Sequence, residues 1–380
     1  MRPLHIAYVA DMVTAHAGGG GIVAGRQFVD LLREEHRVTV IGTEPYGDDS
    51  ITLPAFDFPI PAMKATHFVM AQPLRSVLAR AFADVDVVHL QFPFWLSRVA
   101  LQEAQRARRP AVAAFHVQPE NALSNVGIHA RWLNELIYRD LIGHLYNRAS
   151  GVICPTQFAE RKLRERGLHA PTFVISNGVP PDMVPTEAHR DPAYDGFFLV
   201  VMVGRLAAEK RQEVLIEAVR ASRYADRIKL VIAGAGSREK ALRKLARGLP
   251  NEVEFGFVPR DRLRHLLASA DLFVHCSEVE LEGISVLEAM SMGLPALVAE
   301  GPETAASEIA LGPAFRFPAG DVAALANKLD GFVEHPDLLA NARPFCRAAA
   351  ARRSIGDSIR DLVGVYRHVI ELESSRSVAR

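Results

Sequence analysis

Three glutamates interrupt an apolar stretch in the second half of the chain. Glu280, Glu282 and Glu288 lie in the sequence ELEGISVLEAM, whose other positions are mostly Leu, Ile, Val, Ala and Met. A buried carboxylate is costly unless it is paired or binds a polar ligand. A phosphate group would repel all three, so the groups that suit them are the hydroxyls of a sugar or a ribose. We therefore expect a polyhydroxylated ligand at this stretch.

Glu288 also allows a purely structural interpretation. The residues from Ser285 to Glu288 fit a capping box, with Ser285 as the N-cap and Glu288 closing back on the helix start. Glu280 and Glu282 precede this helix, so the capping box does not account for them. The free N–H groups at the start of the same helix would favour a bound diphosphate. Both interpretations of Glu288 stay open.

Two cations follow an apolar run further upstream. In GRLAAEKR, residues 204–211, Arg205 and Lys210 come directly after the run FFLVVMVG. An arginine fork and a lysine point charge suit a pyrophosphate, and they would stabilise a departing diphosphate. The alternative is a solvated loop, because most Arg and Lys side chains lie on the surface.

A glycine run and two histidines follow apolar runs in the first half. Residues 18–21 are all glycine, and they separate an apolar run from a helical pattern, where backbone N–H groups can approach an anionic ligand. The run is not a GxGxxG fingerprint, so it does not imply a dinucleotide. A flexible turn is the alternative. His116 ends the run PAVAAFH and is equally open to a structural or a functional role, whereas for His89 we favour a structural one.

These groups are positioned by alternating strand and helix patterns. The apolar runs, in which few polar residues alternate, are typical of parallel strands buried on both faces and occupy 4–10, 36–42, 85–91, 110–116, 151–156, 172–178, 197–204, 229–236, 253–258, 270–277 and 294–300. Amphipathic stretches between them predict doubly wound α/β domains. Ligands of such sheets bind at the carboxyl ends of the strands. The turn GAG, 234–236, lacks the third glycine of a dinucleotide-binding fingerprint. We expect it to help line the ligand pocket at these strand ends.

A segment dense in Pro, Asp and Gly divides the alternation into two halves. The predicted organisation is a first domain at 1–180, a linker at 181–196, a second domain at 197–354 and a C-terminal helix within 355–380.

Composition excludes several classes of protein. The formal net charge is +0, which favours neither nucleic acid nor a membrane surface as the partner of the whole chain. The three cysteines have no metal-ligand or disulfide spacing, which is typical of a reducing cytoplasm. The first apolar run is short and is cut by Asp11, so we expect a strand rather than a signal peptide. No window is apolar enough to span a membrane.

Together, GGGG, FHVQPEN, SNGV (176–179), GRLAAEK and ELEGISVLEAMSMGLPALV resemble the retaining glycosyltransferases of family 4. The resemblance runs over nearly the whole chain. It implies the GT-B fold, in which two Rossmann-like domains face a cleft and a C-terminal helix crosses back to the N-terminal domain. It also implies a nucleotide-sugar donor, UDP- or GDP-linked, as co-substrate, without a metal or another cofactor.

The resemblance assigns roles to individual residues. Arg205 and Lys210 would bind the donor diphosphate, and Glu288 would bind the ribose hydroxyls. Glu280 would face the donor sugar near its anomeric carbon. The remaining donor-binding contacts would come from His116 to the sugar, from the backbone N–H groups of Gly283, Ile284 and Ser285, and from Gly19, Gly20 and Gly21 beside the diphosphate and the acceptor. Glu282 receives no role.

The sequence constrains the identity of the acceptor less than it constrains that of the donor. Residues 58–83 carry no acid and combine Lys64, Arg75 and Arg80 with large apolar side chains, which suits an anionic membrane surface. The alternative is an ordinary core helix with solvated cations, and Pro73 interrupts any long helix. The segments FHVQPEN and EGPETAASEIAL (300–311) resemble the branch of the family that glucosylates diacylglycerol.

We therefore expect a hexosyltransferase, with glucose as the first candidate sugar and a membrane lipid or lipid-linked glycan as acceptor. Such an enzyme would be cytoplasmic and peripheral on the inner face of the cell membrane. A small soluble acceptor or a polysaccharide is the alternative within the class. A non-catalytic nucleotide-sugar-binding protein is the alternative outside it.

Overall fold

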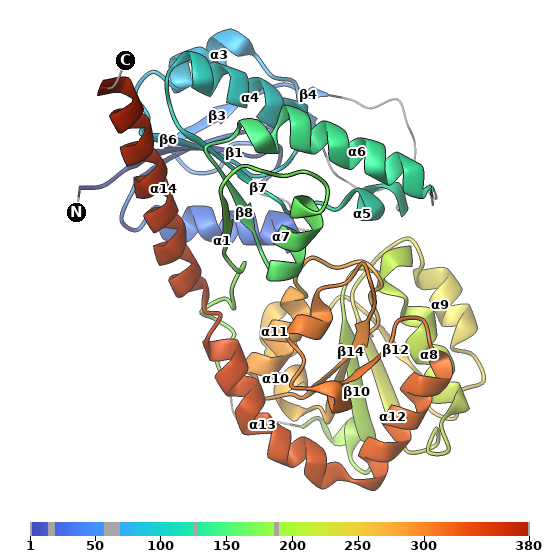
Figure 1. The fold of residues 1–380 in the computed structure, drawn as a ribbon. Helices are drawn as coiled ribbons and strands as arrows, with labels where there is room; N and C mark the ends of the chain where they lie inside the picture. The colour runs from blue at the N-terminus through green and yellow to red at the C-terminus, as the bar shows by residue number, and fades with distance from the viewer. Residues whose placement is uncertain are drawn as a thin grey trace. The chain divides into compact units, whose positions relative to one another are not determined.

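The computed structural model describes residues 2–13, 20–56, 69–124, 128, 130–185 and 190–378, and Figure 1 shows its fold. The chain divides into two compact units. The first consists of Met1–Asn177 together with Ile355–Arg380, and the second is Gly178–Ser354. The residues expected to form a linker, 181–196, belong to the second unit. The predicted architecture of two Rossmann-like α/β domains is confirmed, and each unit is considered below by itself.

The first unit is built on a parallel sheet in the order β3-β2-β1-β6-β7-β8-β9. Its strands are β1 (His5–Val9), β2 (Arg37–Gly42), β3 (Ser50–Thr52), β6 (Val87–Leu90), β7 (Ala111–Ala114), β8 (Gly151–Cys154) and β9 (Thr172–Val174). A small antiparallel pair, β4 (Ala55–Phe56) and β5 (Met70–Ala71), follows β3. The four central strands β1, β6, β7 and β8 are almost wholly buried, as their predominantly apolar sequences predicted.

Helices cover both faces of this sheet (Figure 1). They are α1 (Gly20–Leu32), α3 (Arg75–Ala81), α4 (Trp95–Arg106), α5 (Pro119–Ser124), α6 (Arg131–His144), α7 (Gln157–Arg164) and α14 (Ile355–Val378), with a short 3-10 turn at Tyr146–Arg148. The core on one face joins Ile6 and Tyr8 of β1 to Phe28 of α1 and to Leu362 and Tyr366 of α14. The C-terminal helix is therefore an integral layer of the first unit.

His89 has the structural role that we favoured for it. Its Nδ1 lies 2.8 Å from the hydroxyl of Tyr366, and its Nε2 lies 3.0 Å from Oε1 of Gln91. The ring stacks on Tyr8 at a centroid distance of 4.5 Å. Burial lowers the pKa of His89 to about 4, so the imidazole is neutral at pH 7. These contacts fasten α14 to the sheet.

The second unit repeats the architecture on a parallel sheet in the order β12-β11-β10-β13-β14-β15. Its strands are β10 (Phe198–Val203), β11 (Ile228–Ala233), β12 (Glu254–Gly256), β13 (Leu272–His275), β14 (Ala296–Glu300) and β15 (Arg316–Pro318). Its helices are α8 (Gln212–Ala221), α9 (Glu239–Leu245), α10 (Arg260–Ser269), α11 (Ile284–Ser291), α12 (Val322–Glu334) and α13 (Pro336–Ala351).

Alternate residues of β10 enter two different cores of the second unit. Val200 and Met202 pack with residues of α8 and α12, whereas Leu199 and Val201 pack with residues of α10, α11 and α13. A strand buried on both faces needs apolar side chains at every position, which explains the continuous run in the sequence.

Two further expectations concern membranes and cysteine chemistry. None of the described helices combines the length and the apolar character needed to cross a bilayer. Cys154, Cys276 and Cys346 are all buried and free. In the described ranges, no three His, Cys, Asp or Glu side chains gather as metal ligands.

Candidate functional site

The carboxyl ends of β10 and β11 meet because two glycines allow their loops to touch. A Cβ atom at Gly234 would lie 1.9 Å from the carbonyl oxygen of Gly204, and one at Gly236 would lie 2.4 Å from that of Leu206. Any side chain at either position would collide with backbone. The GAG turn therefore serves close packing of the loop that carries Arg205 and Lys210.

Arg205 is held in place by a buried carboxylate. Its Nη2 donates to Oε1 of Glu209 at 2.8 Å, and Nε2 of Gln212 donates to its carbonyl oxygen at 2.7 Å. Glu209 is only 4% exposed, whereas the Arg205 side chain is 42% exposed. In the described part of the chain, no hydrogen-bond partner reaches Oε2 of Glu209. One side of the guanidinium is thus anchored and the rest remains accessible to a ligand.

Lys210 and Glu280 form an ion pair at the same edge of the sheet. Nζ of Lys210 donates to Oε2 of Glu280 at 2.7 Å. The backbone of Glu280 is fixed on both sides, because its N–H donates to Glu303 at 3.0 Å and its carbonyl accepts from Ala305 at 2.9 Å. The two residues are 70 positions apart in sequence, so only the fold brings them together.

His275 lies next to the carboxylate of this ion pair. Its Nε2 is 3.4 Å from Oε2 of Glu280, and burial lowers the pKa of the imidazole. Burial by itself would raise the pKa of Glu280, but Lys210 and then His275 overcome that effect and hold the pKa well below its usual range. Glu280 is therefore an ionised carboxylate at pH 7, fixed beside a cation.

The predicted capping box is wrong. The N-cap of α11 is Gly283, with φ 88°, and no side chain caps the helix start. Ser285 is consequently the second residue of the helix. A left-handed N-cap favours glycine, and this shifts the helix start two residues upstream of the predicted one. The first-turn N–H groups, which include those of Ile284 and Ser285, have no partner within the helix itself.

The carboxylate of Glu288 binds an arginine instead of its own helix. Nη1 of Arg260 donates to Oε1 of Glu288 at 2.6 Å, and Arg260 also binds both carboxylate oxygens of Asp182, at 2.7 and 3.0 Å. Burial raises the pKa of Glu288, and Arg260 opposes that rise. Glu282 is 3% exposed and is therefore not on the open surface.

In the first unit, Gly21 of the glycine run lies beside His116. A Cβ atom at Gly21 would lie 3.4 Å from Cβ of His116 and 3.4 Å from the ring of Phe92. Nε2 of Gln91 donates to the carbonyl oxygen of Gly21 at 3.0 Å. Gly20 begins α1, and Gly19 lies outside the described residues. Burial and then His89 lower the pKa of His116 to about 3, so the ring is neutral at pH 7.

Asp11 is a buried carboxylate at the same edge of the first sheet. It follows β1, it is 0% exposed, and its Oδ1 accepts from the backbone N–H of Ala71 at 2.9 Å. In the described ranges its Oδ2 has no hydrogen-bond partner. Burial raises the pKa of Asp11 to about 6. In the sequence, Asp11 stands out only as a charge that cuts the first apolar run.

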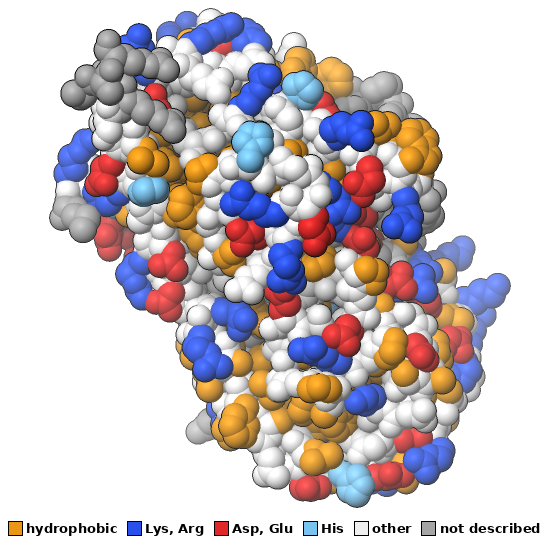
Figure 2. Space-filling model, in the orientation of Figure 1, with side chains coloured by type: hydrophobic (Ala, Val, Ile, Leu, Met, Phe, Trp, Pro, Cys, Tyr) orange, Lys and Arg blue, Asp and Glu red, His pale blue; other side chains and the backbone are white. Residues whose placement is uncertain are grey.

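Of the three cations predicted to contribute to membrane binding, the structure describes Arg75 and Arg80. Lys64 lies outside the described residues. Nη1 of Arg75 donates to Glu103 at 2.6 Å, so its charge is compensated, whereas Arg80 is exposed on α3. Figure 2 shows basic and acidic side chains interspersed over the face in view. On that face, no broad surface of one sign stands out.

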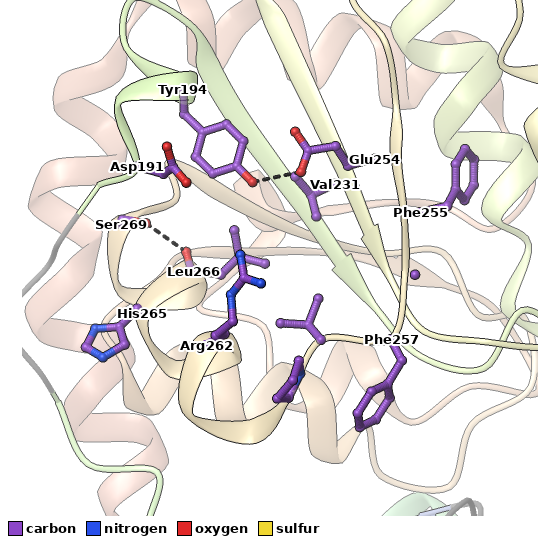
Figure 3. A pocket seen from close by; sticks show the side chains of 13 residues that line it. Asp191, Tyr194, Val231, Glu254, Phe255, Phe257, Arg262, His265, Leu266 and Ser269 are labelled. Carbon is purple, nitrogen blue, oxygen red and sulfur yellow. Dashed lines mark hydrogen bonds between the residues drawn. The ribbon is translucent and has the colours of Figure 1, made fainter.

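A separate pocket lies between β12 and α10 (Figure 3). It has a volume of about 450 Å³, and Arg262 and His265 of α10 contribute to its lining. Across it, the hydroxyl of Tyr194 donates to Oε2 of Glu254 at 2.9 Å. None of the described residues with a predicted functional role lines this pocket.

Solved structures share the whole two-domain architecture. A crystal structure of HepE from Anabaena in complex with UDP-glucose superposes with a TM-score of 0.73 and 21% identity, and the match covers 98% of this chain and 100% of that one. This likeness defines the fold as GT-B, the two-domain class of glycosyltransferases.

Sequence comparisons specify the family. The family model "Glycosyltransferase Family 4" matches residues 17–183, and "Glycosyl transferases group 1" matches residues 185–348. A GDP-mannose-dependent alpha-mannosyltransferase of Mycolicibacterium smegmatis is 30% identical over 328 residues, which are 79% of this chain and 81% of the relative. An alpha-monoglucosyldiacylglycerol synthase of Streptococcus pneumoniae is 23% identical over 233 residues, 58% of this chain and 53% of the relative. The chain belongs to glycosyltransferase family 4, and it is an enzyme that uses a nucleotide sugar.

Proposed function

We propose that this enzyme transfers a hexose from a nucleoside-diphosphate donor to a hydroxyl group of a membrane lipid or lipid-linked glycan, with retention of anomeric configuration. The proposal for the donor is supported mainly by the position of Arg205, Lys210 and Glu280 at one edge of the second sheet. The start of α11 follows Glu280 in the chain. Two cations and one ionised carboxylate match a ligand that is anionic at one end and rich in hydroxyls at the other.

The cations bind the diphosphate in this proposal. Arg205 offers the free side of a guanidinium whose other side is anchored on Glu209. Glu280 does not enclose the ammonium group of Lys210, since the Lys210 side chain is 20% exposed. The ammonium can therefore also contact a phosphate. As the bond between the anomeric carbon and the phosphate oxygen breaks, negative charge accumulates on the diphosphate. Preorganised cations and the first-turn N–H groups of α11 stabilise that charge.

The carboxylates bind hydroxyl groups. Glu280 is ionised, and a carboxylate accepts strong hydrogen bonds from sugar hydroxyls near the anomeric carbon. Glu288 accepts from the ribose hydroxyls, with Arg260 fixing its orientation. His116 contacts the sugar as a neutral imidazole. Gly20 and Gly21 leave room for the diphosphate and the acceptor. Gly19, which lies outside the described residues, is assigned to the same ligand from the sequence alone.

The reaction has an oxocarbenium-like transition state. The acceptor oxygen attacks the anomeric carbon on the face that the diphosphate leaves, which retains the configuration. The acceptor proton passes to the departing phosphate oxygen. Glu280 is assigned no role as a nucleophile in this scheme, and it acts as an ionised carboxylate that accepts hydrogen bonds from the sugar.

The sugar and the acceptor are the finer part of the proposal. Glucose from a UDP donor is the first candidate, and the name of the mycobacterial relative adds mannose from a GDP donor as the second. The name of the pneumococcal relative supports a lipid acceptor. A lipid acceptor would require the enzyme to work in the cytoplasm as a peripheral protein on the inner face of the cell membrane, and the exposed Arg80 would add to its attraction for anionic lipid.

A donor screen tests this function. Nucleotide release from UDP-, GDP- and ADP-linked hexoses would be measured with and without a lipid extract, and the anomeric configuration of the product would be read by NMR. Lys210→Ala should reduce turnover at least about a hundredfold, because it removes a charge that acts mainly on the leaving group. Glu288→Ala should weaken donor binding. Binding of a nucleotide sugar without any release would favour the non-catalytic alternative, and inversion of configuration would refute retention.

A further inference from the structure

Both tryptophans of the chain are exposed on the first unit. Trp95 is 45% exposed and Trp132 is 68% exposed, although a side chain of this size is usually buried for most of its area. Trp95 is the first residue of α4, and Trp132 is the second residue of α6. The helix α4 joins the carboxyl end of β6 to the amino end of β7, and α6 follows β7 and α5 and leads to the amino end of β8 (Figure 1). Both tryptophans therefore belong to the edge of the sheet at which Gly21 and His116 lie.

Further exposed apolar side chains accompany each tryptophan. The ring of Phe56, 40% exposed, packs edge-on against Trp95 at a centroid distance of 6.0 Å. Leu136, 46% exposed, lies one helical turn after Trp132, and Ile128, 41% exposed, precedes the same helix. We call these five residues the tryptophan edge: Phe56, Trp95, Ile128, Trp132 and Leu136. Trp132 and Leu136, at positions i and i+4 of α6, thus leave an apolar helix face exposed among the described residues.

Among the described residues, the charges of α6 that form no ion pair are positive. Arg131 and Arg139 are exposed on α6, and no ion pair among the described residues involves either of them. The acids of the same helix are compensated by other groups. Glu135 binds Arg166 at 2.9 Å, and Asp140 binds Arg98 and lies 3.0 Å from His144. The helix thus presents apolar side chains flanked by uncompensated cations.

We propose that the tryptophan edge docks on the surface of an anionic lipid bilayer. Tryptophan and arginine together match the boundary between acyl chains and headgroups, because the indole is apolar with one polar N–H and the guanidinium attracts lipid phosphate. Docking there brings the carboxyl edge of the first sheet, with Gly21 and His116, next to the headgroups. The inference rests on the proposed lipid acceptor, and it identifies where that acceptor is drawn from.

The chain itself supplies a spectroscopic test. In the variant Trp95→Phe, Trp132 is the sole tryptophan, so its emission reports the environment of α6 alone. We expect a shift of this emission to shorter wavelength on addition of phosphatidylcholine vesicles that contain phosphatidylglycerol. We also expect quenching by lipids brominated on the acyl chain. Emission that stays unchanged with such vesicles would overturn the proposal.

A binding experiment separates the docking surface from general adhesion. Trp132→Ser combined with Leu136→Ser should reduce vesicle binding at least about tenfold, since two apolar side chains leave the interface. The matched control is Phe345→Ser on α13 of the second unit, a residue that is 66% exposed and should leave binding unchanged. Circular dichroism would establish that each variant is folded. Equal loss in both variants, or no loss in either, would overturn the docking surface.

The same variants distinguish this inference from the proposed function. The Trp132→Ser, Leu136→Ser variant should retain nucleotide release with a short-chain, water-soluble acceptor and lose it with the acceptor in vesicles. Loss with both acceptors would indicate damage to the site and refute a role confined to docking. Vesicle binding without transfer to any lipid would uphold the docking surface and refute the lipid acceptor. Self-association of the wild-type chain that the variant abolishes would identify the tryptophan edge as a subunit interface instead.

Discussion

Replacing Glu280 with glutamine tests the donor site most directly. The substitution keeps the shape of the side chain and removes the charge that Lys210 binds at 2.7 Å. With an effective dielectric constant of ~20, Coulomb's law gives roughly 6 kcal/mol for two charges at that distance. Removing the two groups from water offsets much of this attraction, and each side chain keeps about a fifth of its surface exposed. We therefore expect Glu280→Gln to lower the free energy of unfolding of the second unit by about 2 kcal/mol.

The loss of stability should depend on pH in a defined direction. In the folded state Lys210 and His275 hold the pKa of Glu280 below its usual 4.5, so ionisation of this carboxyl favours folding. That contribution is complete above pH 4.5 and is lost as the pH falls through the folded-state value. The difference between wild type and Glu280→Gln should thus be largest near pH 7 and should shrink as the pH is lowered below 4.5.

Urea unfolding at several pH values measures this difference, and a melting experiment at pH 7 should show a decrease of about 4–8 °C for a unit of this size. The control is Glu278→Gln, which removes a partly exposed carboxylate 3.2 Å from Arg211 and should change little. If Glu280 binds the donor sugar, turnover should fall while affinity for the free nucleoside diphosphate is kept. Unchanged stability at pH 7, or a difference that is the same at pH 7 and pH 4, would refute the reasoning.

Two further substitutions test buried carboxylates. Glu209→Gln weakens the anchor of Arg205, so we expect kcat/KM to fall about tenfold without a loss of stability. Glu213→Gln is the control. Kinetics of Glu209→Gln that match the wild type would contradict a positioning role. Asp11→Asn removes a carboxyl group whose pKa in the folded state, about 6, exceeds its ordinary value of 3.8. Ionisation of Asp11 therefore destabilises the folded state, and this destabilisation is absent below pH 3.8 and complete above pH 6. We expect the variant to be more stable by up to about 3 kcal/mol at pH 7.5 in urea unfolding and to lose this advantage below pH 4; a variant that is less stable than wild type at pH 7.5 would contradict it.

Most of the strands were predictable from apolar runs in the sequence, whereas the short strands β3, β4, β5 and β15 and the order of the strands were not. Runs such as FFLVVMVG need apolar side chains at every position because both faces of β10 are covered. The neighbours of β10 are β11 and β13, and the pairing with β13 bridges about 70 residues of chain. Hydrophobic pattern sets which face a side chain occupies, whereas pairing across such a gap is decided by helix packing on both faces.

The partners within the site were the least predictable part. Arg205, Lys210 and Glu280 were identified from residue type and motif, but Glu209 and His275 were not. A glutamate between two cations in GRLAAEKR was the available signal for Glu209. No local signal exists for Arg260, which reaches Glu288 from 28 residues upstream.

The capping box failed for a reason that the sequence contained. Gly283 adopts φ 88° and already serves as the N-cap, so the pattern of Ser285 and Glu288 begins two residues too late. A glycine before a helical pattern competes with a serine for the cap position, and the left-handed conformation decides in favour of glycine.

The return of α14 to the first sheet has a consequence for how the protein is made. The first unit is discontinuous, since it needs Ile355–Arg380 as well as Met1–Asn177. On the ribosome, the whole second unit is synthesised before Leu362 and Tyr366 can cover the apolar face beside Tyr8. The later-encoded unit can therefore finish folding first, while the nascent first unit carries an uncovered sheet that chaperones would recognise. A fragment ending at Asn177 would keep that face exposed permanently.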